Sequence, residues 1–239
     1  AFPLPATALF REHATRALIP EMSFDTQGGQ ISISFVGVSA AASAANGNIS
    51  ITPPTTATNH IMLATITSLD NVASTFPAGW TVYLEGNNGA GLRSTLAWKR
   101  CTGAEAAFTV THAAGGAIRG RVTVYSGCVE SGSPINVSSL RHNAASNTCT
   151  ADTITPTVPN CLIVFTAHIV SALGGIANDA AATDPATLTQ RFVDATSPGG
   201  SIADAYNMAG GATGNATETI GGAASVNSGG LTTLTPMEV

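Results

Sequence analysis

Apolar and polar side chains alternate along the stretch from Gly79 to Cys128, which predicts several β-strands in succession. In its last part Ile118, Val122 and Val124 fall on one face of a strand, because side chains on a strand alternate with a period of two. The opposite face carries Arg119, Arg121, Thr123 and Tyr125. Clusters of Gly, Asn and Ala-Gly between the runs are typical of turns. The pattern indicates half-buried antiparallel sheet, and we expect an all-β fold.

The same alternation extends the predicted sheet on both sides of this stretch. Residues 30–39 alternate Ile31, Ile33 and Phe35 with Ser32, Ser34 and Val36. An apolar strand is expected at 60–68 and another strand near 133–139. The polar residues 140–148 that follow indicate a connector between two halves of the chain.

The second half of the chain echoes the first. Residues 51–68 and 154–171 both read Ile-Thr-Pro, then a turn ending in Asn, then an apolar strand. This alignment places His60 opposite Cys161, and Thr67 opposite His168. Three later segments can be laid on the first half in the same order: 191–196, 201–209 and 214–234. We expect one β domain over 23–239, with halves at about 23–140 and 141–239, forming an antiparallel, jelly-roll-like sandwich of two sheets.

Residues 1–22 differ from everything after them. They hold three prolines, four charged residues and a set of apolar side chains: Phe2, Leu4, Leu9, Phe10, Leu18 and Ile19. A loose terminus is one interpretation, since chain ends are commonly poorly ordered. The other is an extended arm whose apolar residues contact a neighbouring subunit.

Composition narrows the classes of partner. Of the 239 residues, 44% are hydrophobic and only 10% are charged, which is typical of a compact protein rather than a disordered one. The net charge of −5, with nine basic residues, argues against binding to nucleic acid. No apolar run approaches the ~20 residues that span a bilayer, so we expect no membrane insertion.

Four cysteines are present, without the closely spaced pairs of a zinc site. They are buried free thiols or disulfides, and four cysteines allow three pairings. If the strands that end at Cys101 and Cys128 run the same way, both thiols lie at one end of the sandwich. The candidate disulfide residues are Cys101, Cys128, Cys149 and Cys161.

Catalytic motifs are missing from the sequence. It contains no G-x-S-x-G elbow, no Walker loop and no H-E-x-x-H pair. The five histidines are dispersed, and a Ser-His-Asp triad could only be assembled in space. Asp70, Glu85 and Glu105 could flank a sugar cleft, but we interpret them as solvated loop residues. We therefore expect no catalytic residue, no cofactor and no metal site.

The two tryptophans allow two interpretations. Trp80 and Trp98 could stack on a carbohydrate, but each lies in an apolar strand pattern, which favours a place in the core. Arg119 and Arg121 form either an exposed strand surface paired with cross-strand acids or a contact in an interface.

One family resemblance rests on several short patterns in a fixed order. They are Pro77–Thr81 (PAGWT), Trp98–Arg100 (WKR), Thr102–Thr111, Val122–Cys128 (VTVYSGC) and Ser133–Ile135. This order resembles a β-sandwich module of tailed-phage virion proteins that also occurs in some bacterial surface proteins. There the last strand often ends in Tyr-x-Gly, as Tyr125–Gly127 does here. The resemblance covers about residues 30–235 and implies no catalytic residue.

Together these features predict a non-enzymatic virion protein that decorates a capsid or forms an accessory tail part. Its expected partners are other copies of itself and a capsid or tail protein, contacted through the arm and through Arg119 and Arg121. The alternative is a bacterial surface adhesin or carbohydrate-binding sandwich, located outside the cell or on its surface, with a host glycan as ligand.

Overall fold

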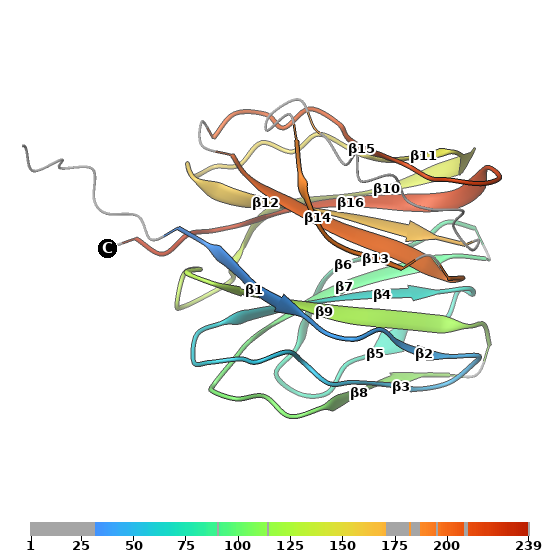
Figure 1. Ribbon diagram of the computed structural model, residues 1–239, viewed down its shortest axis with the longest axis horizontal. Helices are drawn as coiled ribbons and strands as arrows, with labels where there is room; N and C mark the ends of the chain where they lie inside the picture. Colours follow the sequence, from blue (N-terminus) through green and yellow to red (C-terminus); the bar gives the residue numbers. More distant parts are fainter. Residues whose placement is uncertain are drawn as a thin grey trace, which may run out of the picture.

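A computed structural model of the protein describes residues 32–89, 91–113, 115–170, 182, 187–194, 196–207 and 210–238 (Figure 1). Within these residues the regular structure consists of β-strands, and neighbouring strands run antiparallel. The predicted all-β antiparallel sandwich is confirmed. The arm over residues 1–22 and the expected start of the domain at residue 23 lie outside the described residues.

The first half of the chain forms one large and one small sheet. The strands of the large sheet follow the order β1 (Ser34–Val38), β9 (Ile118–Ser126), β4 (Ile61–Ser68), β7 (Arg93–Arg100) and β6 (Thr81–Asn87), with β2 (Ala42–Ala44) also paired to β9. The small sheet contains β3 (Ile49–Ile51), β8 (Phe108–His112) and β5 (Ser74–Thr75) in that order.

The second half forms a second pair of sheets. The large one has the order β10 (Ile135–Ser146), β16 (Ser225–Leu234), β12 (Cys161–Ile169), β14 (Gly199–Asn207) and β13 (Thr189–Asp194). The small one pairs β11 (Thr148–Ala151) with β15 (Ala216–Thr219).

The two halves repeat one topology, as the internal sequence echo predicts. In each large sheet the last strand of the half lies between the first strand and the central one, and the remaining two strands follow. Asn59 and Asn160 lie at equivalent positions just before the central strands, since Asn160 immediately precedes β12 and only His60 separates Asn59 from β4. They are the two residues other than glycine with positive φ in the described chain, 66° and 55°. Asn tolerates this left-handed conformation better than most residues, so both halves use it to enter the central strand.

Connections within the first half follow a jelly-roll path. The chain passes from β3 in the small sheet to β4 in the large one, then to β5 in the small sheet. It later passes from β7 in the large sheet to β8 in the small one, and returns to the large sheet with β9. Alternation between two facing sheets is typical of a jelly roll. The strand β6 departs from it by pairing with β7 at the edge of the large sheet.

The four sheets are stacked as four layers, with the large sheets in the middle and the small ones outside (Figure 1). Three apolar cores fill the spaces between layers. The middle core joins the large sheets and includes Leu63 of β4 and Val164 of β12. The outer cores lie beneath the small sheets, and they include Ile51 of β3 and Ala216 of β15. Because cores lie on both of their faces, β4 and β12 are buried along their whole length.

This stacking corrects one expectation about burial. The segment Ile118–Ser126 was expected to be half-buried, but Thr123 and Tyr125 on its polar face have no exposed surface. The second half covers that face, so the strand is buried on both sides. The period-two pattern identified the strand correctly and could not reveal the second covering layer.

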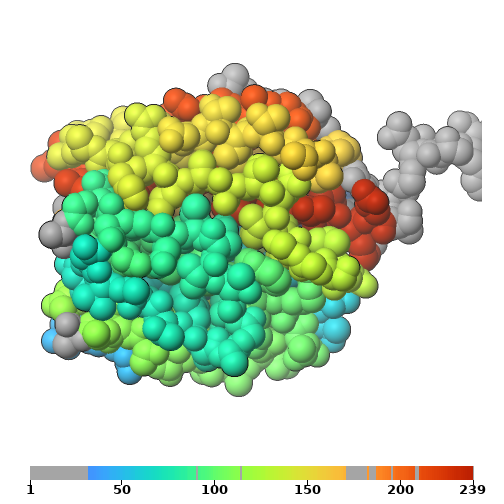
Figure 2. All heavy atoms as spheres, turned by 180° about the vertical axis from the view of Figure 1, so that it is seen from behind, coloured from blue at the N-terminus to red at the C-terminus, as the bar shows by residue number. Residues whose placement is uncertain are grey.

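The prediction of a connector at residues 140–148 is wrong. Residues 140–146 continue β10, a strand of 12 residues paired with β16. Its polar side chains are accommodated by bonds to neighbouring strands, such as Asn143 Nδ2 to Asn227 Oδ1 at 2.9 Å. In the view from behind, the yellow-green and yellow atoms of β10 border the blue-green atoms of the first half (Figure 2), and β10 contacts β6.

Candidate functional site

The contact between the two large sheets changes from apolar to polar along its length. The inward residues of β4 are Ile61, Leu63, Thr65 and Thr67, because Met62, Ala64 and Ile66 face the outer core. The inward residues of β12 are Leu162, Val164, Thr166 and His168 for the same reason. We call the polar end of this contact the polar seam, formed by Thr65, Thr67, Ser94, Arg119, Arg121, Thr166, His168 and Asp194.

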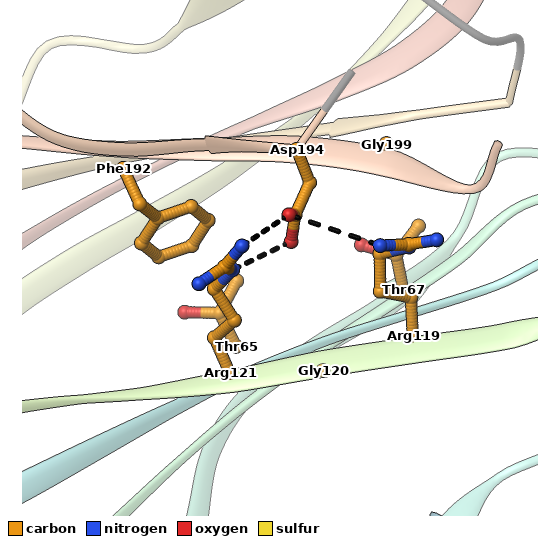
Figure 3. Close-up of a pocket in the computed structure, with 9 residues that line it drawn as sticks. Thr65, Thr67, Arg119, Gly120, Arg121, Phe192, Asp194 and Gly199 are labelled. Atoms are coloured by element: carbon orange, nitrogen blue, oxygen red, sulfur yellow. Dashed lines mark hydrogen bonds and ion pairs between the residues drawn. The ribbon is translucent and has the colours of Figure 1, made fainter. Parts of the chain in front are cut away.

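An arginine–aspartate pair ties the two halves together in the polar seam (Figure 3). Arg121 of β9 donates from Nε and Nη2 to the two carboxylate oxygens of Asp194 at the end of β13, at 2.8 and 2.6 Å. Its Nη1 donates to the carbonyl oxygen of Ser39 at 2.8 Å. The guanidinium lies 5.0 Å from the centre of the Phe192 ring. A bidentate ion pair whose guanidinium also stacks on an aromatic ring fixes the orientation of both charged side chains.

Arg119 approaches the same carboxylate more loosely. Its Nη1 lies 3.8 Å from Asp194 Oδ1. The side chains of Arg119 and Arg121 are 17% and 19% exposed, so neither forms a solvated strand surface. Their acidic partner comes from the facing sheet and not from a neighbouring strand. The contact that both arginines make in this structure is between the halves of one chain.

A second charged cluster lies further along the contact, toward the apolar end. Arg191 donates to both carboxylate oxygens of Asp204, at 2.8 and 2.7 Å, and the Tyr125 hydroxyl donates to the same carboxylate at 3.0 Å. Burial, followed by the Asp204 charge, raises the pKa of Tyr125 well above its usual value. The Arg191 guanidinium lies 4.5 Å from the centre of the Phe35 ring. Residues from both halves therefore share one buried carboxylate.

Two histidines form hydrogen bonds near the contact between the halves, His168 in the interior and His142 at an exposed position of β10. His168 Nδ1 lies 2.8 Å from Thr67 Oγ1, and His142 Nδ1 lies 2.9 Å from Ser228 Oγ. Burial, with a smaller effect of His142, lowers the pKa of His168 to about 3. Burial also lowers the pKa of His142. Both rings are neutral at physiological pH and act as hydrogen-bonding groups.

One Ser-His-Asp cluster does assemble in space. The pairing of β5 with β8 places Ser74 opposite His112, with Ser74 Oγ 3.3 Å from His112 Nδ1. His112 Nε2 lies 3.0 Å from Asp70 Oδ2. No spacing in the sequence marks these residues, because Asp70 and His112 are 42 positions apart and only strand pairing joins them.

The surroundings of this cluster point to a structural role. The Asp70 carboxylate also accepts from the backbone amides of Val72, at 3.0 Å, and Gly116, at 2.5 Å. Burial alone would raise the pKa of Asp70, but these amide bonds and the one from His112 together hold it below its usual value. Ser74 is only 7% exposed, so its hydroxyl is not presented to a substrate. The cluster joins the loop that contains Asp70 to the loop that contains Gly116. It lacks the accessible nucleophile that acyl transfer requires.

The other acids considered for sugar cleavage are separated and paired. Glu85 accepts from Arg93 at 2.7 Å, and Glu105 accepts from Lys99 at 2.6 Å. Asp70 follows the end of β4, whereas Glu105 follows the end of β7, which lies beside the start of β4. The two acids therefore lie beyond opposite ends of one strand and do not face each other across a cleft.

All four cysteines are buried free thiols, so none of the candidate disulfides forms in the structure. Cys149, Cys101 and Cys128 belong to three different apolar cores, which the sheets keep apart. Burial raises the pKa of Cys101 to about 11, that of Cys128 to about 12 and that of Cys161 to about 11. These thiols act as small apolar side chains.

Both tryptophans pack against the cores, as expected. Trp80 lies between Phe76 and Phe108, with ring centres 5.3 and 4.7 Å away. Trp98 packs against the middle core between the large sheets. Both rings are partly buried by these contacts.

Two surface hollows adjoin each other around Met237. One, of about 470 Å³, is lined by Val129, Glu130, Thr235, Pro236, Met237 and Glu238. The other, of about 330 Å³, shares Glu130 and Met237 and reaches Ser126. Ser126 pairs with Ser34, the first residue of β1. The hollows therefore lie beside the place where the described chain begins.

No group of three or more His, Cys, Asp and Glu side chains among the described residues is arranged to hold a metal ion. The described part of the chain also contains no helix with the length and hydropathy to cross a membrane.

Comparisons of the sequence with protein-family models and curated proteins, and of the fold with solved structures, found no significant match.

Proposed function

We propose that the protein is a non-enzymatic structural component of a virion or phage-like particle, either a capsid decoration or an accessory tail part. The observation that carries the proposal is that the charged groups between the large sheets are bonded to one another. Arg121, Asp194, Arg191 and Asp204 are all engaged in joining the two halves or their strands. Charged groups that bond to one another stabilise the contact between the halves, which favours a structural role over a catalytic one.

The stacking of the two halves supports the same proposal. Two jelly-roll-like units share a buried core and two charged clusters, so they form one block rather than two units on a linker. The apolar core that both halves share, together with the Arg121–Asp194 and Tyr125–Asp204 contacts, opposes separation of the two halves. A rigid block with fixed edges suits a subunit that is repeated in a lattice, where many weak contacts add up.

The N-terminal arm is the proposed means of contact with neighbouring subunits. Its apolar residues are Phe2, Leu4, Leu9, Phe10, Leu18 and Ile19. The two hollows around Met237 lie near the start of the described chain and offer a concave surface at that end. The adhesin alternative would need Trp80 or Trp98 beside open polar loops, and their packing against the cores gives it no support.

The test is to follow the protein in the culture that produces it. Particles are banded on a density gradient after nuclease treatment, and each fraction is analysed by peptide mass spectrometry. The proposal predicts that this chain bands with a particle at a constant ratio to the major shell or tail protein. Recovery only in the soluble fraction, in a culture that contains such particles, would exclude the virion role.

A further inference from the structure

The sequence contains two Asn-Gly dipeptides, Asn46-Gly47 and Asn88-Gly89, and the structure places them in different surroundings. An asparagine that precedes glycine is prone to spontaneous deamidation, because glycine has no side chain to keep its backbone nitrogen away from the asparagine side chain. Both glycines have positive φ, 81° and 67°, and a Cβ added to either would have nothing within 4 Å of it. Packing therefore crowds neither glycine, and the two sites differ in how the asparagine is held.

Asn46 is exposed in the turn between β2 and β3. Its side-chain amide makes no hydrogen bond to another described residue, and neither does the backbone amide of Gly47. Asn48 in the same turn is held differently, since its Oδ1 accepts from the backbone amide of His112 at 2.9 Å. The side chain of Asn46 is therefore able to turn toward the Gly47 nitrogen without breaking a bond within the protein.

Asn88 joins the first half of the chain to the second. Its Nδ2 donates to the carbonyl oxygen of Asn143 in β10 at 2.7 Å and to that of Asn227 in β16 at 2.8 Å. These two acceptors lie opposite each other in the pairing of β10 with β16. The backbone amide of Asn88 also donates to the carbonyl oxygen of Leu92 at 2.8 Å. The amide nitrogen that deamidation removes is therefore held by two bonds, and both must break before the side chain can react.

We infer that Asn46 is a site of spontaneous deamidation in the folded protein, and that the contact between the halves protects the same dipeptide at Asn88. The backbone nitrogen of Gly47 attacks the side-chain amide carbon of Asn46 and forms a C–N bond. The amide nitrogen leaves as ammonia and takes the proton that the Gly47 nitrogen loses. Water then opens the cyclic imide at either of its carbonyl groups, which gives aspartate or isoaspartate. This inference does not depend on the proposed virion role.

The structure predicts different consequences of conversion at the two sites. At Asn46 the new carboxylate is exposed, so water solvates it and the fold changes little. At Asn88 a carboxylate would replace the donating amide opposite two carbonyl oxygens, which are acceptors as well. Both bonds would be lost, and like partial charges would repel one another across the contact between the halves.

The experiment compares the two dipeptides within one sample of the full chain. The protein is incubated in mildly alkaline buffer, either folded or in concentrated urea, and the peptides that contain Asn46 and Asn88 are followed by mass spectrometry. In urea both sites are expected to convert at similar rates, because the local chemistry is the same. In the folded protein Asn46 is expected to convert roughly 10–100 times faster than Asn88, since two hydrogen bonds must first break at Asn88.

Two variants that carry the aspartate product test the role of the contact. Asn46→Asp is expected to leave the melting temperature within about 1 °C of the parent protein, whereas Asn88→Asp is expected to lower it by roughly 4 °C or more. If Asn88→Asp does not fold, the conversion rates of the parent protein still decide the question. Equal rates at the two sites in the folded protein would overturn the inference. So would an Asn46 that stays intact in the folded protein while the sample in urea is fully converted.

Discussion

Thr67 Oγ1 lies 2.8 Å from His168 Nδ1, and these two residues occupy equivalent positions in the two halves of the chain. Thr67 lies six residues after Ile61, the first inward residue of β4, and His168 lies six residues after Leu162, the first inward residue of β12. Equivalent residues meet in this way near the axis of a two-fold dimer interface. The two halves are therefore arranged like the subunits of a symmetric dimer joined in one chain.

The pH dependence of stability tests the burial of His168. Its pKa is about 3 in the folded protein, against 6.5 for an ordinary histidine, so between these values the unfolded chain binds one more proton. The contribution of the neutral ring is complete above about pH 6.5 and is lost as the pH falls toward 3, by up to about 1.4 kcal/mol per pH unit. His168→Asn keeps a partner for Thr67 and removes the proton site.

The measurement is the free energy of unfolding from denaturant titrations between pH 7 and about 4. His142 and the carboxylates also titrate in this range, so the quantity of interest is the difference in slope between the two proteins. The parent protein is expected to lose stability more steeply than His168→Asn. Identical slopes would mean that His168 takes up its proton without unfolding.

The buried carboxylate of Asp204 is expected to be important for stability. It is 1% exposed and accepts from Arg191 and Tyr125. Asp204→Ala leaves a half-buried guanidinium without its partner and is expected to cost about 3–5 kcal/mol. Asp152→Ala is the matched control, since Asp152 forms an exposed pair with Arg141, and it is expected to cost less than about 1 kcal/mol. Equal losses in urea titrations of the two variants would contradict the assigned role of the network.

Two equivalent glycines permit the close packing of the small sheets. Gly120 pairs with Ile66 in the first half, and Gly229 pairs with Ala167 in the second. A Cβ on Gly229 would collide with the backbone of Thr150, whereas one on Gly120 would meet the flexible ends of Ile66 and Ile49.

Alanine variants of these glycines are expected to differ in cost because backbone cannot move aside as readily as a side chain. We expect about 3 kcal/mol or more for Gly229→Ala and about 1–3 kcal/mol for Gly120→Ala. Gly91→Ala is the control, since nothing lies within 4 Å of the added carbon, and it should change stability by less than about 0.5 kcal/mol. Thermal unfolding ranks the three, and a Gly229→Ala variant as stable as Gly91→Ala would contradict the described packing.

The number of free thiols can be measured directly. All four are buried thiols, and burial raises the pKa of each of them above its usual value. A thiol reagent at pH 8 should therefore modify none of them in the folded protein and all four after denaturation without a reductant. Two or fewer reactive thiols in the denatured protein would show that a disulfide forms after all.

The strands and the duplication could be predicted because they depend on local patterns. Period-two alternation marks a strand wherever one face is apolar, and the repeated Ile-Thr-Pro segments at residues 51 and 154 lead into the equivalent strands β4 and β12. Asn before each central strand belongs to the same local signal, since Asn59 and Asn160 adopt the left-handed conformation.

The contacts between the halves could not be predicted because they join residues far apart in the sequence. Arg121 and Asp194 are 73 positions apart, and only the stacking of the large sheets brings them together. The polar face of Ile118–Ser126 looks like a solvated surface until that second layer is present. The same holds for the polar end of β10, whose pairing with β16 gave no local sign.

The central claim is that this block assembles through its arm, and the mass of the native protein tests it most directly. Light scattering is recorded across a range of concentrations for the full chain and for a variant lacking residues 1–22, with thermal unfolding as the control for folding. The account predicts oligomers of the full chain and monomers of the shortened one, with nearly equal melting temperatures. A full chain that stays monomeric at every concentration, with or without residues 1–22, would contradict assembly through the arm.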